Sequence, residues 1–138
     1  MTEDEAKRRC GAAQVARLAT VGAQGRPHIV PICFALDGET LYSAVDAKPK
    51  STTSLRRLKN AAAHPHVAVL VDHYDEDWST LWWVRIDGRA RIATGDEREH
   101  ALALLRDKYE QYRRQPPPGP VLAIEALAWR SWASAEFS

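Results

Sequence analysis

Cysteine is scarce in this chain, and its charges almost cancel. The 138 residues include two cysteines, Cys10 and Cys33, with no CxxC spacing and no histidine cluster nearby, so neither a disulfide framework nor a cysteine metal site is expected. With 19 Lys and Arg against 18 Asp and Glu, the net charge of +1 provides no overall basic field for nucleic acid. We therefore expect a reduced, cytoplasmic protein without a nucleic-acid partner.

Long apolar runs and the usual catalytic motifs are also missing. No segment approaches the roughly 18 apolar residues of a membrane span, and the charged residues 1–9 lack the apolar stretch of a signal peptide. The five histidines show no metal-ligand spacing, and there is no GxSxG motif. We expect no membrane partner, and an enzyme built from this chain would need a cofactor to carry the chemistry.

Short extended segments separated by turn signals dominate what is present. GAQG at 22–25 and Asp37-Gly38 are hairpin signals, and the expected strands are 15–21, 28–36, 41–45, 67–72, 81–93 and 121–133. Helices are expected over 3–13, from the lysine-rich turn to His64-Pro65, and from Thr94 to about Tyr112. The pattern predicts one domain over 1–138 that is mainly β, a six-stranded antiparallel barrel with flanking helices.

For three segments the sequence also predicts which side chains are covered. Both faces of 28–36 are apolar, so this strand is expected to be covered on both sides, and Pro31 marks an edge, a bulge or the approach of something other than backbone. On the helix after the lysine turn, Leu55, Leu58 and Ala62 share one face. The expected inner face of the long strand is Trp82, Val84, Ile86, Gly88, Ala90 and Ile92, and the buried stripe of the third helix is Ala101, Leu102, Leu105, Tyr109 and Tyr112.

The segment 43–60, SAVDAKPKSTTSLRRLKN, is the first candidate site. A strand leads through Lys48, Pro49 and Lys50 to small hydroxyl residues at a helix N-terminus, where free N–H groups and the helix dipole favour an anion. Arg56 and Arg57 follow on the same helix. The alternative is a solvated turn with an ordinary helix cap and a basic helix face.

Aromatic and arginine side chains form two further candidates. Trp78, Trp82 and Trp83 are either core or subunit-interface anchors or a surface on which a flat heteroaromatic ligand stacks. Arg85, with two further arginines on the same strand face, predicts either cross-strand salt bridges or an anion-binding wall.

The order of these motifs resembles the pyridoxamine 5'-phosphate oxidase-like split-barrel family, and within it the branch of coenzyme F420-dependent oxidoreductases. The resemblance rests on ARLATVGAQGRPHIVPICFALDG, LYSAVDAKPKS, LRRLKN, HPHVAVLVDHYDEDW and LWWVRIDGRARI, and is clearest over 15–93. It implies a six-stranded split barrel that forms a homodimer, with flavin or deazaflavin sites in grooves between the subunits. The Arg- and His-rich substrate motif of the oxidase itself is missing near the C-terminus, which argues against oxidation of pyridoxamine phosphate.

The resemblance also assigns roles to particular residues. By position, Lys48, Lys50 and Ser51 would hold the cofactor phosphate, and Arg56 or Arg57 would assist with a longer anionic tail. The ring system would be lined by Val30, Pro31, Ile32, Ser43, Ala44 and Val45, while Trp78, Trp82, Trp83 and Arg85 would come from the partner subunit or close the groove.

The leading functional hypothesis is hydride transfer from reduced F420 to an electron-poor small molecule. FMN is the alternative cofactor, because its phosphate would suit the same lysines. A carrier of flavin, deazaflavin or haem without catalytic activity is the alternative from another class. No catalytic residue is assigned, and Tyr42, His28, His73 and bulk water stay open as proton donors.

Overall fold

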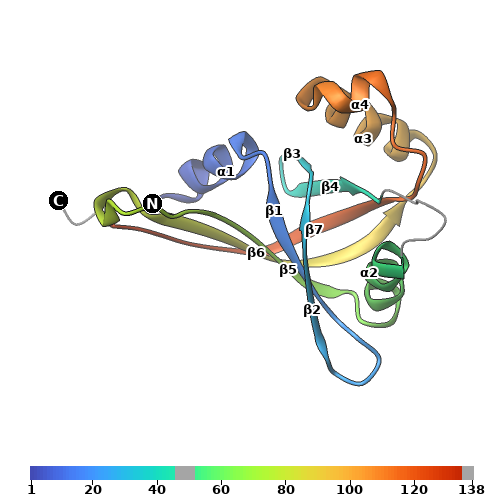
Figure 1. The fold of residues 1–138 in the computed structure, drawn as a ribbon, viewed down its shortest axis with the longest axis horizontal. Coiled ribbons are helices and arrows are strands. Elements are labelled where there is room, and N and C mark those ends of the chain that lie inside the picture. Colours follow the sequence, from blue (N-terminus) through green and yellow to red (C-terminus); the bar gives the residue numbers. More distant parts are fainter. Residues whose placement is uncertain (46–51, 135–138) are drawn as a thin grey trace.

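A curled antiparallel sheet with flanking helices makes up most of the molecule (Figure 1). The computed structural model describes residues 1–45 and 52–134. Within these residues the strands are β1 (Ala16–Val21), β2 (Pro27–Ile32), β3 (Ala35–Asp37), β4 (Thr40–Ala44), β5 (His66–His73), β6 (Trp82–Ala93) and β7 (Val121–Ala133). The helices are α1 (Glu3–Ala12), α2 (Thr52–Ala63), α3 (Gly95–Lys108), α4 (Glu110–Arg114) and the short 3-10 helix η1 (Trp78–Thr80). The strand order β2-β1-β5-β6-β7-β4-β3 confirms a mainly β half-barrel.

The two predicted hairpin turns, the Thr2 cap and the end of the second helix are confirmed. Gly22 to Arg26 link β1 to β2, and Gly38 adopts a φ of 60° in the turn between β3 and β4. That positive φ is accessible to glycine at little cost. The Thr2 side chain caps α1 by accepting a hydrogen bond from the Glu5 N–H at 3.1 Å, and α2 ends at Ala63, just before His64-Pro65.

The prediction of six strands is wrong, because the expected strand 28–36 divides into β2 and β3. The backbone of Phe34, in the gap, bonds to a side chain instead of to a neighbouring strand. Its N–H donates to Tyr109 Oη at 2.9 Å, and the Tyr109 hydroxyl lies 3.0 Å from the Phe34 carbonyl. Ser43 Oγ donates to the Cys33 carbonyl at 2.8 Å. The chain passes here from β2, at one edge of the sheet, to β3, at the other. These bonds satisfy the backbone groups that have no strand partner on the way.

The sheet has an inner face around the main core and an outer face opposite to it. Among the residues whose burial is described, seventeen buried ones form the inner core, with Phe34, Leu18, Leu41, Ile86 and Ile124 among the largest. Helices α1 and α2 contribute Ala6, Cys10 and Ala61. A second apolar cluster lies on the outer face under α3, where Ala101, Leu102 and Leu105 cover Tyr42, Ala44, Ala93, Val121 and Ala123. In Figure 1, α3 and α4 lie on one side of the β4–β7 end of the sheet and α2 on the other. This end is therefore covered on both faces.

Coverage of both faces does not extend to β2, where it was predicted. Ile29 is 65% exposed, and Pro31 and Cys33 are also exposed, so the outer side of this strand is open in the single chain. Pro31 lies in an edge strand paired only with β1. Because an edge strand pairs on one side only, a proline there can lack its N–H without cost to the sheet.

A β-bulge decides which side chains of β7 face outward. Asp87 pairs with Ala128 but Gly88 pairs with Ala126, so Leu127 is an extra residue. Beyond the bulge, Trp132 pairs with Trp83 on the outer face, whereas Trp129 packs against the inner core. A Cβ on Gly88 would lie 2.7 Å from Ile124 Cγ2 and 2.8 Å from the Glu125 carbonyl oxygen, so the close approach at the bulge requires glycine.

Three smaller predictions need correction. Ala61 is buried on α2 where Ala62 was expected, because the helix turns a slightly different face to the core. Ile92 is 46% exposed because it lies near the end of β6, beyond the inner core. The third helix ends at Lys108, since Tyr109 adopts extended backbone angles while its hydroxyl bonds to Phe34, and α4 follows separately.

Candidate functional site

The predicted phosphate site is only partly within the described residues. Lys48, Lys50 and Ser51 lie outside them. The helix predicted to follow is present as α2, which begins at Thr52, and Arg56 is exposed on it while Arg57 is half-buried.

A basic cavity lies between α2 and the β1–β2 hairpin. It has a volume of about 680 Å³ and is lined by Gly22, Ala23, Gln24, Arg26, Pro27, His28, Arg56, Lys59, Asn60 and Ala63. Arg26, Arg56 and Lys59 bring three cations to this lining, and none of the described residues in it carries a carboxylate. Like charges that share a cavity without a counter-charge repel one another, so an anion bound there would be stabilised by all three.

A buried hydrogen bond joins the helix to the sheet beside the basic cavity. Asn60 is 7% exposed, and its side-chain amide donates to Thr20 Oγ1 of β1 at 3.1 Å. This buried hydrogen bond holds α2 against the strand that leads into the hairpin. Sequence reasoning missed Arg26, Lys59 and Asn60 as members of one site, because the hairpin and the helix meet only in the folded chain.

The six residues predicted to line a ring system occupy different environments. Pro31 is exposed and Val30 is half-buried, but Ile32 is 4% exposed. Ser43, Ala44 and Val45 are all buried; the hydroxyl of Ser43 is bonded to Cys33, and the Val45 N–H donates to the Pro120 carbonyl at 2.8 Å. Of these six side chains, only Pro31 offers a largely open surface.

The predicted tryptophan cluster is divided between the two faces of the sheet. Trp82 packs against the inner core, with the Arg9 guanidinium 5.5 Å from its ring centroid. Trp83 belongs to the outer face, and Trp78 is 71% exposed in η1. Arg85 Nε lies 2.9 Å from Asp87 Oδ1, so this predicted anion-site residue already has a carboxylate partner.

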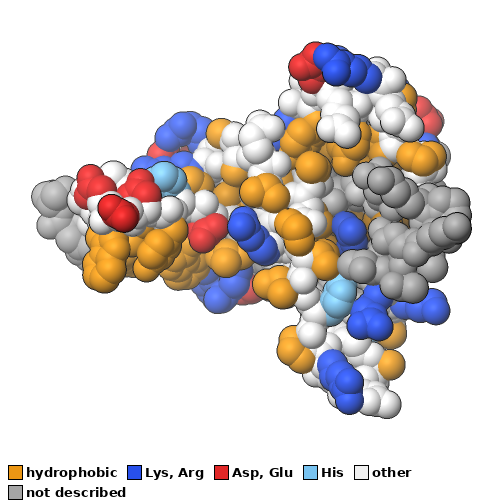
Figure 2. Space-filling model, viewed as in Figure 1, with side chains coloured by type: hydrophobic (Ala, Val, Ile, Leu, Met, Phe, Trp, Pro, Cys, Tyr) orange, Lys and Arg blue, Asp and Glu red, His pale blue; other side chains and the backbone are white. Residues whose placement is uncertain are grey.

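An apolar groove of about 450 Å³ runs across the open half of the outer face. Its lining comprises Arg17, Ala19, Ile29, Ala68, Leu70, Asp72, Tyr74, Leu81, Trp82, Trp83, Arg85 and Trp132. We call it the outer groove. In Figure 2, hydrophobic side chains gather along the lower edge of the arm formed by the far ends of β5, β6 and β7. Exposed apolar surface of this extent is typical of an interaction site.

The charged groups near α3 form a closed network instead. Arg91 pairs with Glu97 and lies 3.1 Å from Glu125, and the Tyr42 hydroxyl donates to Glu97 at 2.9 Å. The Arg91 guanidinium lowers the pKa of Glu97, and desolvation together with Glu97 raises the pKa of Tyr42 to about 12. A buried phenol that already donates to a carboxylate is poorly placed to give a proton to a substrate, which argues against Tyr42 as the proton donor.

Other kinds of site find no support in residues 1–45 and 52–134. No group of three or more His, Cys, Asp or Glu side chains there could hold a metal ion. No helix in that part of the chain combines the length and apolarity needed to cross a membrane.

Comparison with known proteins places these features in a family. The family model described as pyridoxamine 5'-phosphate oxidase matches residues 2–133. A 5a,11a-dehydrotetracycline/5a,11a-dehydrooxytetracycline reductase of Streptomyces rimosus is 39% identical over 56 residues, which are 41% of this chain and 38% of the reductase.

Solved structures show the same fold over nearly the whole chain. The conserved hypothetical protein Rv2991 of Mycobacterium tuberculosis superposes with a TM-score of 0.81 at 23% identity, over 99% of this chain and 88% of that one. An FAD-binding protein of Mesorhizobium loti superposes with a TM-score of 0.72 at 21% identity, over 95% and 94% of the two chains. Because the family model covers nearly the whole chain, the chain belongs to the pyridoxamine 5'-phosphate oxidase family.

Proposed function

We propose that this protein is an oxidoreductase that uses a flavin-type cofactor, with coenzyme F420 as the preferred one, to reduce an electron-poor organic molecule. The observation that carries the proposal is the basic cavity beside α2, where the described lining residues include three cations and no carboxylate, which suits an anionic cofactor. Family membership and the partial similarity to a reductase agree with redox chemistry.

The residues of the chain would bind and orient the cofactor. Lys48, Lys50 and Ser51 stay the predicted phosphate ligands, and Arg26, Arg56 and Lys59 would hold a longer anionic tail in the basic cavity. When bound, reduced F420 would supply a hydride to the substrate. Since FMN has no such tail, the cavity favours F420 over FMN.

A homodimer would complete the site. The outer groove exposes Ile29, Trp83 and Trp132 beside two charged pairs, Arg17 with Asp72 and Arg85 with Asp87. Apolar surface bordered by both signs of charge suits a second copy of the same surface, as twofold symmetry requires. Pro31 is on the same open side, so a partner packed there would lie beside the predicted ring position.

Titration with F420 and with FMN, followed by tryptophan fluorescence quenching, tests the choice of cofactor. We expect tighter binding of F420, and a Lys50→Ala variant that folds normally but binds it more weakly. One charge-assisted hydrogen bond contributes on the order of 1.5–3 kcal/mol. Tighter binding of FMN, or unchanged affinity in the Lys50→Ala variant, would contradict the assignment.

A protein that binds such a cofactor without turnover is the second candidate, favoured by the structural similarity to an FAD-binding protein. Single-turnover oxidation of bound, reduced F420 by quinones, enones and tetrapyrroles distinguishes the two. We expect oxidation by at least one class faster than the same reaction without protein. Equal rates with and without protein would favour the carrier.

A further inference from the structure

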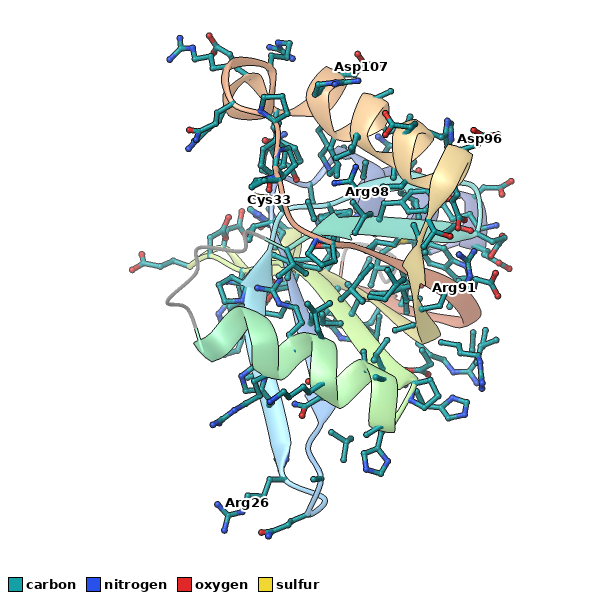
Figure 3. All side chains as sticks on the ribbon, turned by 90° about the vertical axis from the view of Figure 1, so that its right-hand side faces the viewer. Arg26, Cys33, Arg91, Asp96, Arg98 and Asp107 are labelled. Carbon is teal, nitrogen blue, oxygen red and sulfur yellow. The ribbon has the colours of Figure 1, made fainter. Side chains whose placement is uncertain are left out.

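The free edge of β2 combines an apolar, exposed strand with an unusual number of prolines. Within the described residues β2 is the first strand of the sheet and pairs only with β1. Its sequence, PHIVPI, carries no Lys, Arg, Asp or Glu, and Pro27, Ile29 and Pro31 are exposed. In Figure 3, β2 runs from near Arg26, at the tip of the hairpin, towards Cys33. An exposed apolar edge strand of this kind is normally a template on which another strand can add.

The hydrogen bonds of the β1–β2 hairpin show which backbone groups point to the free edge. The Gly22 N–H donates to the Arg26 carbonyl at 2.8 Å, so these two residues form a hydrogen-bonded pair of the antiparallel ladder. Hydrogen-bonded and non-hydrogen-bonded pairs alternate along such a ladder. Following the register from this pair, Pro27, Ile29 and Pro31 are all in non-hydrogen-bonded pairs with β1. Their backbone groups therefore point away from β1, to the free edge.

Two of these three residues are prolines, which have no N–H to donate. Of residues 27–32, Ile29 alone has an N–H that points to the free edge. If a second copy added there in a symmetric antiparallel pairing centred on Ile29, Pro27 of each copy would lie opposite Pro31 of the other. Hydrogen bonds could then form only between the two Ile29 residues. One such pair does not offset the entropy lost when two chains are ordered against each other.

The free edge on the other side of the sheet is limited in a different way. It is formed by β3, which has only three residues, Ala35–Asp37. A very short edge strand is a poor template for another strand. The edge of β2 is therefore the one at which prolines make a difference.

We propose that the β2 edge is a latent self-association surface, which Pro27 and Pro31 close to the β2 strand of a second copy. With N–H groups at both positions, two β2 strands could pair along their edges and join two sheets into one. That contact is made by backbone groups, whereas the homodimer proposed above uses side chains of the outer groove. The inference does not depend on a cofactor or on the proposed function.

The experiment compares the full-length wild-type chain, without cofactor, with the double variant Pro27→Val/Pro31→Val. Valine restores the N–H and favours extended backbone. Sedimentation velocity over a concentration series should show larger species in the double variant, with an apparent association constant at least about tenfold higher than that of the wild type. Each single variant should lie between the two. Pro118→Ala is the control for loss of an exposed proline, and it should sediment like the wild type.

Hydrogen exchange followed by NMR locates the contact. In the wild-type protein the amides of His28 and Val30, which point to β1, should be protected, and the amide of Ile29 should exchange fast. In the assembled double variant the Ile29 amide should become protected. A protected Ile29 amide in the wild type, or larger species in which this amide still exchanges fast, would overturn the proposal.

Circular dichroism establishes that each variant is folded. If the double variant does not fold, the same two measurements on Pro27→Val and Pro31→Val decide. Folded variants that sediment like the wild type overturn the proposal, as does equal association of Pro118→Ala. Adding Trp83→Ala to the double variant separates the two surfaces, because it should weaken the homodimer and leave the edge contact intact. Loss of all association in that triple variant would assign the assembly to the outer groove and overturn the proposal.

Discussion

The outer face of the sheet has two halves: in one the side chains are buried or paired, and in the other they are open. Under α3, Leu105 and its neighbours are buried, and Arg91 and Glu97 form a closed network. Across β1, β2 and the first part of β6, apolar side chains such as Ile29 are open, and three cations share the nearby basic cavity. Groups that already have partners stabilise the fold. Open apolar surface, and cations that have no counter-charge among the described residues, are available to a partner or a ligand.

The largest expected effect is on the covered half. Leu105→Ala should lower the free energy of unfolding by about 2–5 kcal/mol, since a fully buried leucine leaves a cavity when truncated. Urea denaturation measures this change. Leu127→Ala is the matched control, because Leu127 is 60% exposed at the bulge, and its effect should be within about 0.5 kcal/mol. Equal losses in the two variants would contradict the assignment of the second core.

Removal of Trp83 tests whether the open half is a subunit interface. Trp83→Ala should weaken self-association by about tenfold or more, because large aromatic side chains dominate interface energies. Analytical ultracentrifugation over a concentration series measures it. Ile92→Ala is the control, as Ile92 is exposed near the other end of the same strand. A Trp83→Ala protein that associates like the wild type would mean that the outer groove has another occupant.

Removal of charge from the basic cavity should affect binding and leave stability unchanged. Lys59→Gln and Arg26→Gln are each expected to weaken F420 binding by about fivefold, which corresponds to ~1 kcal/mol for a partly solvated ionic contact. The same substitution at Arg114, on α4, should leave the affinity unchanged. Fluorescence titration measures all three, and an equal loss in the Arg114 variant would indicate general electrostatics only.

The smallest effect is expected in the network under α3. Glu97→Gln should cost about 0.2–1 kcal/mol at neutral pH, since the ion pair with Arg91 is partly exposed. The pKa of Glu97 is lowered from its ordinary 4.5, so this contribution is present above that pH and is lost as the pH falls through the lower folded value. Thermal unfolding at pH 7 and pH 3 should show the difference between variant and wild type shrinking in acid. A difference that grows in acid would contradict this linkage.

Local signals in the sequence predicted the elements well. These signals act between neighbours in the chain, and the structure has each of them: the hairpin glycines, the Thr2 cap, and the end of α2 just before His64-Pro65. The division of β2 from β3 was not predictable in this way, since it depends on the Tyr109 hydroxyl, 75 positions away from Phe34.

The candidate site was predictable only in part, for the same reason. The basic character of Arg56 was evident, but its companions Arg26 and Lys59 were missed because a helix and a hairpin loop must meet to form the cavity. Trp82 and Trp83 were expected to act together, but neighbours in a strand point to opposite faces. Both contribute to the lining of the outer groove, yet Trp82 also packs against the inner core.

Short-range patterns in the sequence were enough to predict the strand-rich fold and its turns, because alternation, glycine turns and caps act over a few residues. Which surfaces are open was decided by the tertiary structure. The extra residue at Leu127 turns Trp132 outward to join Trp83, and α3 covers one half of the outer face but not the other. Burial and electrostatic pairing depend on contacts between segments that are far apart in the sequence, so no short stretch of sequence predicts them.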